Sequence, residues 1–572
     1  MRVSRAELAA SAALFLLLAS PAFAQLGPPI PLLPSPAGGT APAPAPAAPA
    51  ESAGGAGDDI SATPLAPMDT SWVGILGPAD GAFPRSLWAA TPRTVVAAAL
   101  PLLQPTTSPV LQDLARRLLL SDAVAPPGQD AAAGSGLADL RFDRVLALGR
   151  IDGIPLINAM PQTQLSEALD RDSVELRFAA NDVGGACALI QDRAARYRDV
   201  WWDRALVACQ ALTGHFDEAA LGLSAMRERK TLDDPAFAVL IETIDGHRRK
   251  LDKLPDPTPM RMTLLAAAKL PLPAEALAAA SPAALAVWAT SDKVPAADRL
   301  AAGEKAQAFG ALPPGGLGLL YGSIDATAAE QSAALKGGKL PDDARGRAIL
   351  YDIARANGAP ATRAAALAPL LADARRRGVY ATTARLVAPL VVEMQPASAL
   401  SGFAGDAARV LMAAGHVDLA APWIDLAKLP ELRVVAGLAR APGSDEGASP
   451  VKDAIADLTA RDAAAAPRQI DLLAALLSAL GQPITAIDLA PLLRMTHVGI
   501  LPGAALWLDQ QQAAAGGRLG ETVLTSLLLA TAGDRLTVEP ILLARVVSGL
   551  KAVGLEADAR ALAVEAALDA GI

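Results

Sequence analysis

Apolar side chains recur every three or four residues along much of the chain, and Gly or Pro separates one apolar stripe from the next. One stripe, at spacing i, i+3, i+4 and i+7, consists of Trp202, Ala205, Leu206 and Cys209. The next stripe consists of Ala219, Leu223 and Met226. This spacing places the apolar side chains on one face of a helix. The pattern therefore predicts two amphipathic helices that meet at a short corner.

The residues of the corner between these helices predict how one helix ends and the next begins. Gly214 can adopt the left-handed conformation that ends a helix, and Asp217 is predicted to cap the free N–H groups of the next helix. A nearly identical sequence begins at Gly415, with Asp418 at the position that corresponds to Asp217. The stripe that overlaps and follows it consists of Ala420, Trp423, Ile424 and Ala427. Three further corners are predicted at Asn181, Gly481 and Gly554. Asn is the next best residue after Gly for a left-handed cap.

The spacing of these corners resembles that of the tetratricopeptide repeat, a helix–turn–helix unit of about 34 residues. Asn181 and Gly214 are 33 residues apart, and Gly415 and Gly481 are 66 apart. Trp202 and Leu206 lie near the first aromatic residue and the leucine of the consensus, whereas Gln210 departs from it. The resemblance mainly covers 165–230 and 400–572. It implies an all-α fold of stacked helical hairpins, an α-solenoid.

Composition supports the helical class and the division of the chain. Aromatic residues make up only 3% of the sequence, and the abundant Ala and Leu lose little rotamer freedom in a helix. Leu-Pro steps interrupt the pattern between 253 and 343, which predicts an irregular helical joint. Helical-repeat regions are predicted on either side of it, at 69–252 and 344–572.

The first residues resemble a secretory signal peptide, predicted over 1–24. Arg2 and Arg5 precede the apolar run 8–19, and a small-x-small pattern predicts cleavage between Ala24 and Gln25. The run is shorter than the roughly 20 residues that cross a bilayer, so an uncleaved anchor is the alternative interpretation. No Cys follows the cleavage point to carry a lipid, and no later apolar run has spanning length. We expect a periplasmic or secreted protein without a transmembrane segment in the mature chain.

Residues 25–68 are rich in Pro and Ala and contain no Lys or Arg. Such a composition buries nothing and is typical of an extended, disordered linker.

The two cysteines of the chain are Cys187 and Cys209. An even count in an oxidising compartment predicts a disulfide, with two buried free thiols or a metal pair as alternatives. If Cys187 lies on the second helix of one repeat and Cys209 on the first helix of the next, the bond joins adjacent repeats.

Candidate chemistry is sparse. A net charge of −9 gives no field that attracts phosphate backbones, so we expect no nucleic-acid partner. His215 and His416 stand at the predicted corners, where a structural role is ordinary. No nucleophile elbow, His-Glu-x-x-His pair or Cys-x-x-Cys motif occurs, so we expect no catalytic residue, cofactor or metal.

Three basic clusters, at 227–230, 247–250 and 375–377, are interpreted as solvated faces, with a ligand-facing strip as the alternative. Trp202 lies on the apolar stripe and is predicted to be buried. Trp201 is offset by one position and is the residue placed to face a groove.

The sequence is most consistent with an exported, non-enzymatic scaffold whose helical-repeat surface binds protein or peptide partners in the bacterial envelope. A cell-wall accessory protein that binds or acts on glycan is the first alternative. A structural envelope spacer without a specific ligand is the second.

Overall fold

The computed structural model describes residues 69–130, 135–160, 165–336, 343–356, 358–440, 449–484, 487, 492, 502–531 and 539–572. Within these ranges the fold is all-α, as predicted, and the described residues form no strand. One isolated parallel bridge joins Leu76 to Ser121. The predicted signal peptide, its cleavage point at Ala24 and Gln25, and the predicted linker 25–68 lie outside the described residues.

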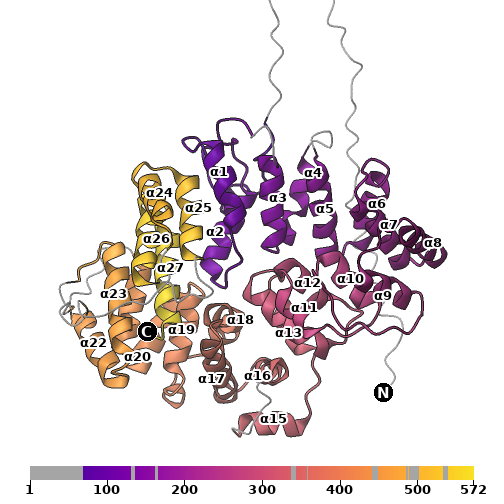
Figure 1. Cartoon of the computed structure of the whole chain (residues 1–572). Coiled ribbons are helices and arrows are strands. Elements are labelled where there is room, and N and C mark those ends of the chain that lie inside the picture. Colours follow the sequence, from indigo (N-terminus) through magenta and orange to yellow (C-terminus); the bar gives the residue numbers. More distant parts are fainter. Residues whose placement is uncertain are drawn as a thin grey trace, which may run out of the picture. The chain divides into compact units, whose positions relative to one another are not determined.

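The elements follow one another along the chain as helices of a few turns joined by short connections (Figure 1). Their bounds are η1 (Pro78–Asp80), α1 (Arg93–Ala99), η2 (Leu100–Leu102), α2 (Pro109–Leu120), α3 (Leu137–Ala147), η3 (Ile151–Gly153), α4 (Ile154–Ala159), α5 (Glu167–Ala179), α6 (Val183–Arg193), α7 (Val200–Leu212), α8 (Phe216–Glu228), α9 (Pro235–Ile244), α10 (Pro259–Ala267), α11 (Ala274–Ala279), α12 (Pro282–Thr290), α13 (Ala296–Ala308), α14 (Gly316–Gly322), α15 (Ala328–Leu335), α16 (Ala344–Ala356), α17 (Pro360–Arg376), α18 (Tyr380–Val392), η5 (Ser398–Leu400), α19 (Ala404–Ala413), α20 (Val417–Ala427), α21 (Pro430–Ala439), α22 (Ser449–Arg461), α23 (Ala466–Ala479), α24 (Ala504–Ala515), α25 (Leu519–Ala530), α26 (Pro540–Ala552) and α27 (Glu556–Asp569).

Most helices pack against their neighbours in sequence. The pairs with extensive contact include α5 with α6, α7 with α8, α12 with α13, α19 with α20, and α26 with α27. This pairing is compatible with stacked helical hairpins. It follows from the short connections, because two helices joined by a few residues bury their apolar stripes against each other.

The buried apolar side chains form two clusters. One contains buried residues from Val174 to Ala311, and the other contains buried residues from Trp72 to Ile572 on both sides of it in sequence. Helix α5 borders both, since Leu169 and Leu176 belong to the second cluster and Phe178 to the first. Helix α13 does the same, since Leu300 belongs to the second cluster and Ala302 to the first.

The beginning of the described chain packs against its end. Helix α2 contacts α25 and α27, and Figure 1 shows α2 beside these C-terminal helices. The backbone N–H of Gly520 in α25 donates to the carbonyl of Leu87, 3.1 Å away. A Cβ at position 520 would lie 2.5 Å from the Trp88 ring and 2.7 Å from that carbonyl oxygen. Only glycine allows the two backbones to come this close.

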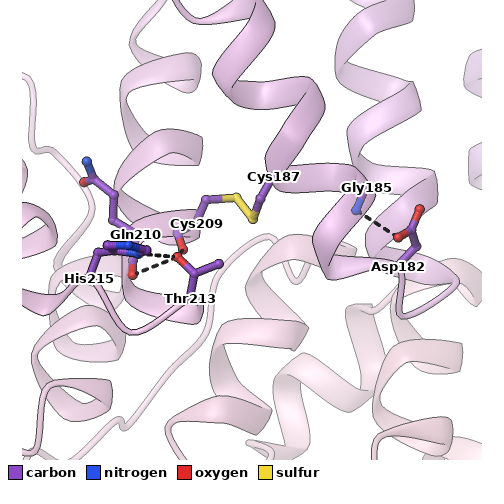
Figure 2. The surroundings of a disulfide bond; sticks show 7 residues. All are labelled: Asp182, Gly185, Cys187, Cys209, Gln210, Thr213 and His215. Atoms are coloured by element: carbon purple, nitrogen blue, oxygen red, sulfur yellow. Dashed lines mark hydrogen bonds between the residues drawn. A yellow bond between two sulfur atoms is a disulfide. The ribbon is translucent and has the colours of Figure 1, made fainter.

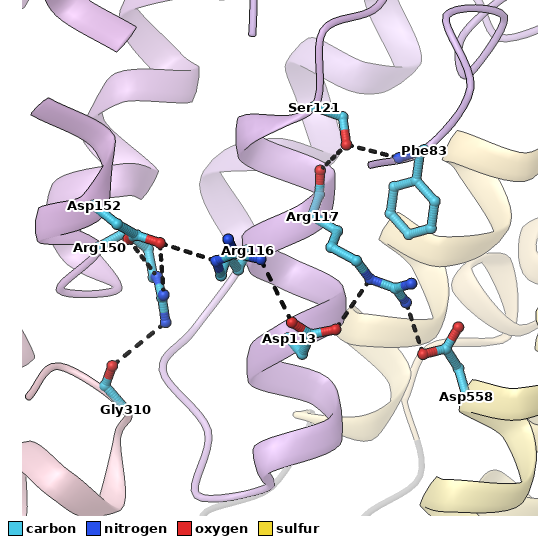
Figure 3. A network of polar contacts seen from close by, with 9 residues as sticks. All are labelled: Phe83, Asp113, Arg116, Arg117, Ser121, Arg150, Asp152, Gly310 and Asp558. Atoms are coloured by element: carbon cyan, nitrogen blue, oxygen red, sulfur yellow. Dashed lines mark hydrogen bonds and ion pairs between the residues drawn. The ribbon is translucent and has the colours of Figure 1, made fainter. Parts of the chain in front are cut away.

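Charged side chains hold α2 on both sides (Figure 3). Arg117 lies 2.7 Å from Asp558 of α27 and 3.1 Å from Asp113 on its own helix. Arg116 donates to Asp152, 3.0 Å away. Burial alone would raise the pKa of Asp152, but Arg150 and Arg116 together hold that pKa below its usual value. The network therefore links α2 to Asp152, 36 residues from Arg116 in sequence, and to Asp558 of α27, 441 residues from Arg117.

Two buried glutamates bond to helix N-termini that are distant in sequence. Glu175 of α5 accepts the backbone N–H of Met260 at the start of α10, at 2.8 Å. Glu565 of α27 accepts the Ser108 hydroxyl and the Val110 N–H, at 3.3 Å for the latter, at the start of α2. Both carboxyl groups thus satisfy free donors of a helix end. Burial raises the pKa of each glutamate to about 7, although these hydrogen bonds favour the ionised form.

Candidate functional site

All five predicted corner residues adopt the left-handed conformation. The φ angles are 59° at Asn181, 85° at Gly214, 82° at Gly415, 76° at Gly481 and 85° at Gly554. Next to Gly214, the N–H of His215 donates to the Gln210 carbonyl at 2.8 Å, so this carbonyl in the last turn of α7 has a hydrogen-bond partner. The left-handed prediction is therefore confirmed at each corner. Residues 485–486, at the far end of the corner that begins at Gly481, lie outside the described residues.

The capping role predicted for Asp217 and Asp418 is wrong. Helices α8 and α20 begin at Phe216 and Val417, so their N-cap residues are His215 and His416, which make no side-chain cap hydrogen bond. The next helix begins directly after the corner, so each Asp is the second residue of that helix. There its charge complements the positive end of the helix dipole instead of capping a donor. At the Asn181 corner the neighbouring Asp182 is the cap, and it accepts the N–H of Gly185 at 2.9 Å.

Left-handed corners also occur where the sequence pattern alone did not single them out. Gly310, Gly378 and Gly517 have φ angles of 69°, 67° and 65°. Each is followed by a residue whose N–H returns to a carbonyl five positions earlier. Gly378, Gly415, Gly517 and Gly554 form two pairs, each 37 residues apart. The same hairpin corner therefore recurs beyond the five predicted positions.

The two cysteines lie together between adjacent hairpins (Figure 2). Cys187 is in α6, Cys209 is in α7, and their sulfur atoms are at bonding distance, 2.00 Å apart. The bond joins the second helix of one hairpin to the first helix of the next, in the arrangement expected from the repeat resemblance. Thr213, at the end of α7, donates to the Cys209 carbonyl at 2.7 Å.

The two tryptophans of α7 differ in burial. Trp202 is buried, stacks with Tyr197 and donates its indole N–H to Glu167 at 3.1 Å. Trp201 is half-buried, with its ring edge-on to Trp202 and the guanidinium of Arg171 5.5 Å from its centre. Trp201 thus packs on its neighbours at the margin of the core.

The structure brings two of the three basic clusters together. Glu242 of α9 pairs with Arg227 of the first cluster at 2.5 Å and with Arg249 of the second at 2.8 Å. The third cluster pairs with other carboxylates. Its Arg377 lies 3.1 Å from Glu304 of α13 and 2.9 Å from Asp373 of α17. Carboxylates therefore compensate much of the positive charge, as expected of solvated faces.

A cavity of about 700 Å³ lies between α23, α24 and α26. Small side chains on facing helices, including Ala475, Ala479 and Ala544, leave the space open. Trp507 of α24 and Ile541 of α26 also line it, and Ile541 is 59% exposed. Binding pockets for small ligands commonly have volumes of about 300–1,000 Å³ and mostly apolar walls. This cavity is the candidate binding site, and no pattern in the sequence indicated it.

Among the described residues, one cation lines this cavity. The Nε–H of Arg545 donates to the side-chain oxygen of Gln510 at 2.5 Å, and its guanidinium lies 5.8 Å from the centre of the Trp507 ring. Gln510 is fully buried and also donates toward Ser526 at 3.3 Å. A Cβ at Gly549 would overlap the Gln510 amide, so the glycine makes room for it. Gln510 is thereby held in one orientation, and it orients Arg545.

Among the described residues no cluster of three or more His, Cys, Asp or Glu side chains has the arrangement of a metal site. None of the described helices is both long enough and apolar enough to cross a membrane. No family model, curated relative or solved structure matches this chain.

Proposed function

We propose that the protein is an exported, non-enzymatic scaffold whose helical hairpins bind a protein or peptide partner in the bacterial envelope. The signal-like N-terminal sequence and the Cys187–Cys209 bond support export, since disulfides persist in oxidising compartments. Tetratricopeptide-like stacking is the finer part of this proposal, and the paired helices and recurring corners support it.

The observation that carries the proposal is the narrow buried stripe of the second helix in two hairpins. Helix α8 buries only Ala219, Leu223 and Met226, and α20 buries only Ala420, Trp423 and Ile424. The rest of each helix is partly or fully open to solvent, including Leu221 at 72% and Leu419 at 49% exposure. Repeat proteins hold partners on extended surfaces that successive repeats form together, and these exposed apolar residues are available for such contact.

Affinity purification tests this function. The tagged mature protein, residues 25–572, is recovered from envelope extracts after mild crosslinking, and co-purifying proteins are identified by mass spectrometry. A parallel sample lacks 25–68, which separates binding by the linker from binding by the helices. We expect one or two stoichiometric protein partners that are retained without the linker.

A surface variant locates the binding face. Leu221→Asp together with Leu419→Asp should reduce recovery of the partner, because a charge on the outward face opposes apolar contact. Leu319→Asp is the matched control, since Leu319 is 79% exposed on α14. If no protein is recovered and cell-wall glycan is retained or degraded instead, the scaffold proposal is wrong and the glycan alternative replaces it.

A further inference from the structure

The described lining of the cavity between α23, α24 and α26 combines apolar walls with one oriented cation. The wall alanines and the Trp507 ring offer contact to a hydrocarbon or aromatic group, and Arg545 offers hydrogen-bond donors at one side. A guanidinium in such a setting favours an anion, because hydrogen bonds between oppositely charged groups are the strong ones.

Arg545 differs from several partly buried arginines that pair with carboxylates. Arg347 pairs with Glu304 at 2.7 Å, and Arg117 pairs with Asp113 and Asp558. No ion pair found among the described residues includes Arg545, and burial lowers its pKa. The charge is partly shielded from water, and no carboxylate among the described residues pairs with it.

The two acidic residues on the cavity lining do not serve as this counterion. Asp471 and Glu539 each have polar or electrostatic contacts of their own, and neither pairs with Arg545. The Arg545 guanidinium is therefore the charged group that a ligand can engage without displacing a protein carboxylate.

The geometry favours pre-organised binding. Gln510 is fully buried and accepts the Nε–H of Arg545. This leaves the two terminal nitrogens of the Arg545 guanidinium for a ligand. A side chain that is already oriented loses little conformational entropy when the ligand binds.

We propose that this cavity binds a small amphiphile with one carboxylate on an apolar chain, the carboxylate on Arg545 and the chain against Trp507, Ile541 and the alanine wall. The proposal goes beyond the scaffold function, because it adds a small ligand to a protein-binding framework. The oriented guanidinium of Arg545 and the cavity size support this occupant over an apolar segment of a protein partner, which would leave Arg545 uncompensated.

Calorimetry on the purified mature protein tests the proposal with three probes that share one chain length: decanoate, decanol and decyltrimethylammonium. We expect decanoate to bind at least tenfold more tightly than decanol, and the cation to bind more weakly than either. Arg545→Gln should reduce decanoate affinity about tenfold or more while leaving decanol affinity nearly unchanged. The matched control Arg433→Gln removes an exposed arginine of α21 and should change neither affinity.

A second variant keeps the test decisive if Arg545→Gln does not fold. Ala475→Phe fills the cavity from α23 and should abolish binding of both decanoate and decanol. The proposal is overturned if decanoate does not bind, if decanol binds equally well, or if Arg545→Gln retains wild-type decanoate affinity. Undiminished binding to Ala475→Phe also overturns it. Partner recovery from envelope extracts is a separate measurement, so failure of the scaffold function is distinguishable from failure of this site.

Discussion

Helices α5–α8 and helices α23–α27 are both built from paired helices, but different contacts hold them in place. In α5–α8 the stabilising contacts are mostly between neighbours in sequence, and the Cys187–Cys209 bond joins positions 22 residues apart. In the C-terminal helices, Glu565, Asp558 and Gly520 contact residues of the first described helices. The comparison teaches that one hairpin design is combined with a local covalent link in the first region, whereas polar contacts of the second region reach residues up to 457 positions away.

The two regions also differ in what they enclose. The alanines and cysteines of α6 and α7 pack into a filled core. Between α23, α24 and α26, facing alanines leave a cavity, and a glutamine orients an arginine into it. The less locally constrained region therefore contains the candidate binding site.

The largest effect should come from pH, because each region contains one buried glutamate with a raised pKa. Glu175 and Glu565 have folded-state pKa values of about 7, above the 4.5 of an exposed glutamate. The folded state thus binds more protons, and its stability falls as pH rises from about 4.5 through 7. Each group is expected to contribute on the order of 3 kcal/mol to this fall. Urea unfolding at pH 5 and pH 8 measures it.

Glu175→Gln and Glu565→Gln separate the two regions, since glutamine mimics the protonated side chain. Each variant should lose only the contribution of its own glutamate, on the order of 3 kcal/mol, and should gain stability at pH 8. Asp172 and Asp569, whose pKa values are raised to about 8 by burial, act in the same direction and remain in both variants. A wild-type protein more stable at pH 8 than at pH 5 would contradict the prediction.

Removal of the disulfide should affect only the first region. The double variant Cys187→Ala and Cys209→Ala is expected to lose about 3 kcal/mol of stability, since an open loop of this size gains entropy in the unfolded chain. Hydrogen exchange should show faster exchange in α6–α8 and unchanged protection in α23–α27. Equal loss of protection in both regions would show that the bond acts globally.

A side chain at position 520 should loosen the contact between α25 and the N-terminal segment. Gly520→Ala places a methyl group against the Trp88 ring and the Leu87 carbonyl, at an expected cost of about 2 kcal/mol. Gly437→Ala is the matched control in α21, because a Cβ there meets nothing within 4 Å. That control should stabilise by about 0.5–1 kcal/mol. Thermal unfolding compares the two, and equal melting temperatures would contradict the close approach.

The smallest effect distinguishes a capping Asp from one inside the first turn. Asp182→Ala removes a side-chain cap on α6 and should cost about 1 kcal/mol. Asp217→Ala removes only a charge near the α8 dipole and should cost about 0.3–0.5 kcal/mol at low salt. Denaturant unfolding at low and high salt provides the measurement. A larger cost for Asp217 would restore the capping role that the sequence predicted.

The sequence predicted the local features of the fold because these depend on residues a few positions apart. Apolar stripes at helical spacing identified the side chains that α8 and α20 bury, and the left-handed corners followed from Gly and Asn. The capping prediction for Asp217 failed because one residue of helix phase separates a cap from a first-turn position. Sequence patterns rarely fix a helix start that finely.

The sequence by itself determined the all-α class and the left-handed corners, and it predicted that the two cysteines pair. Each of these is governed by backbone conformation and side-chain spacing over short stretches. Only the tertiary structure decided which helix ends receive Glu175 and Glu565, how α25 meets Trp88, and that Gln510 orients Arg545 into a cavity. These contacts join residues that are far apart in sequence or on facing helices, and the path of the folded chain alone brings them together.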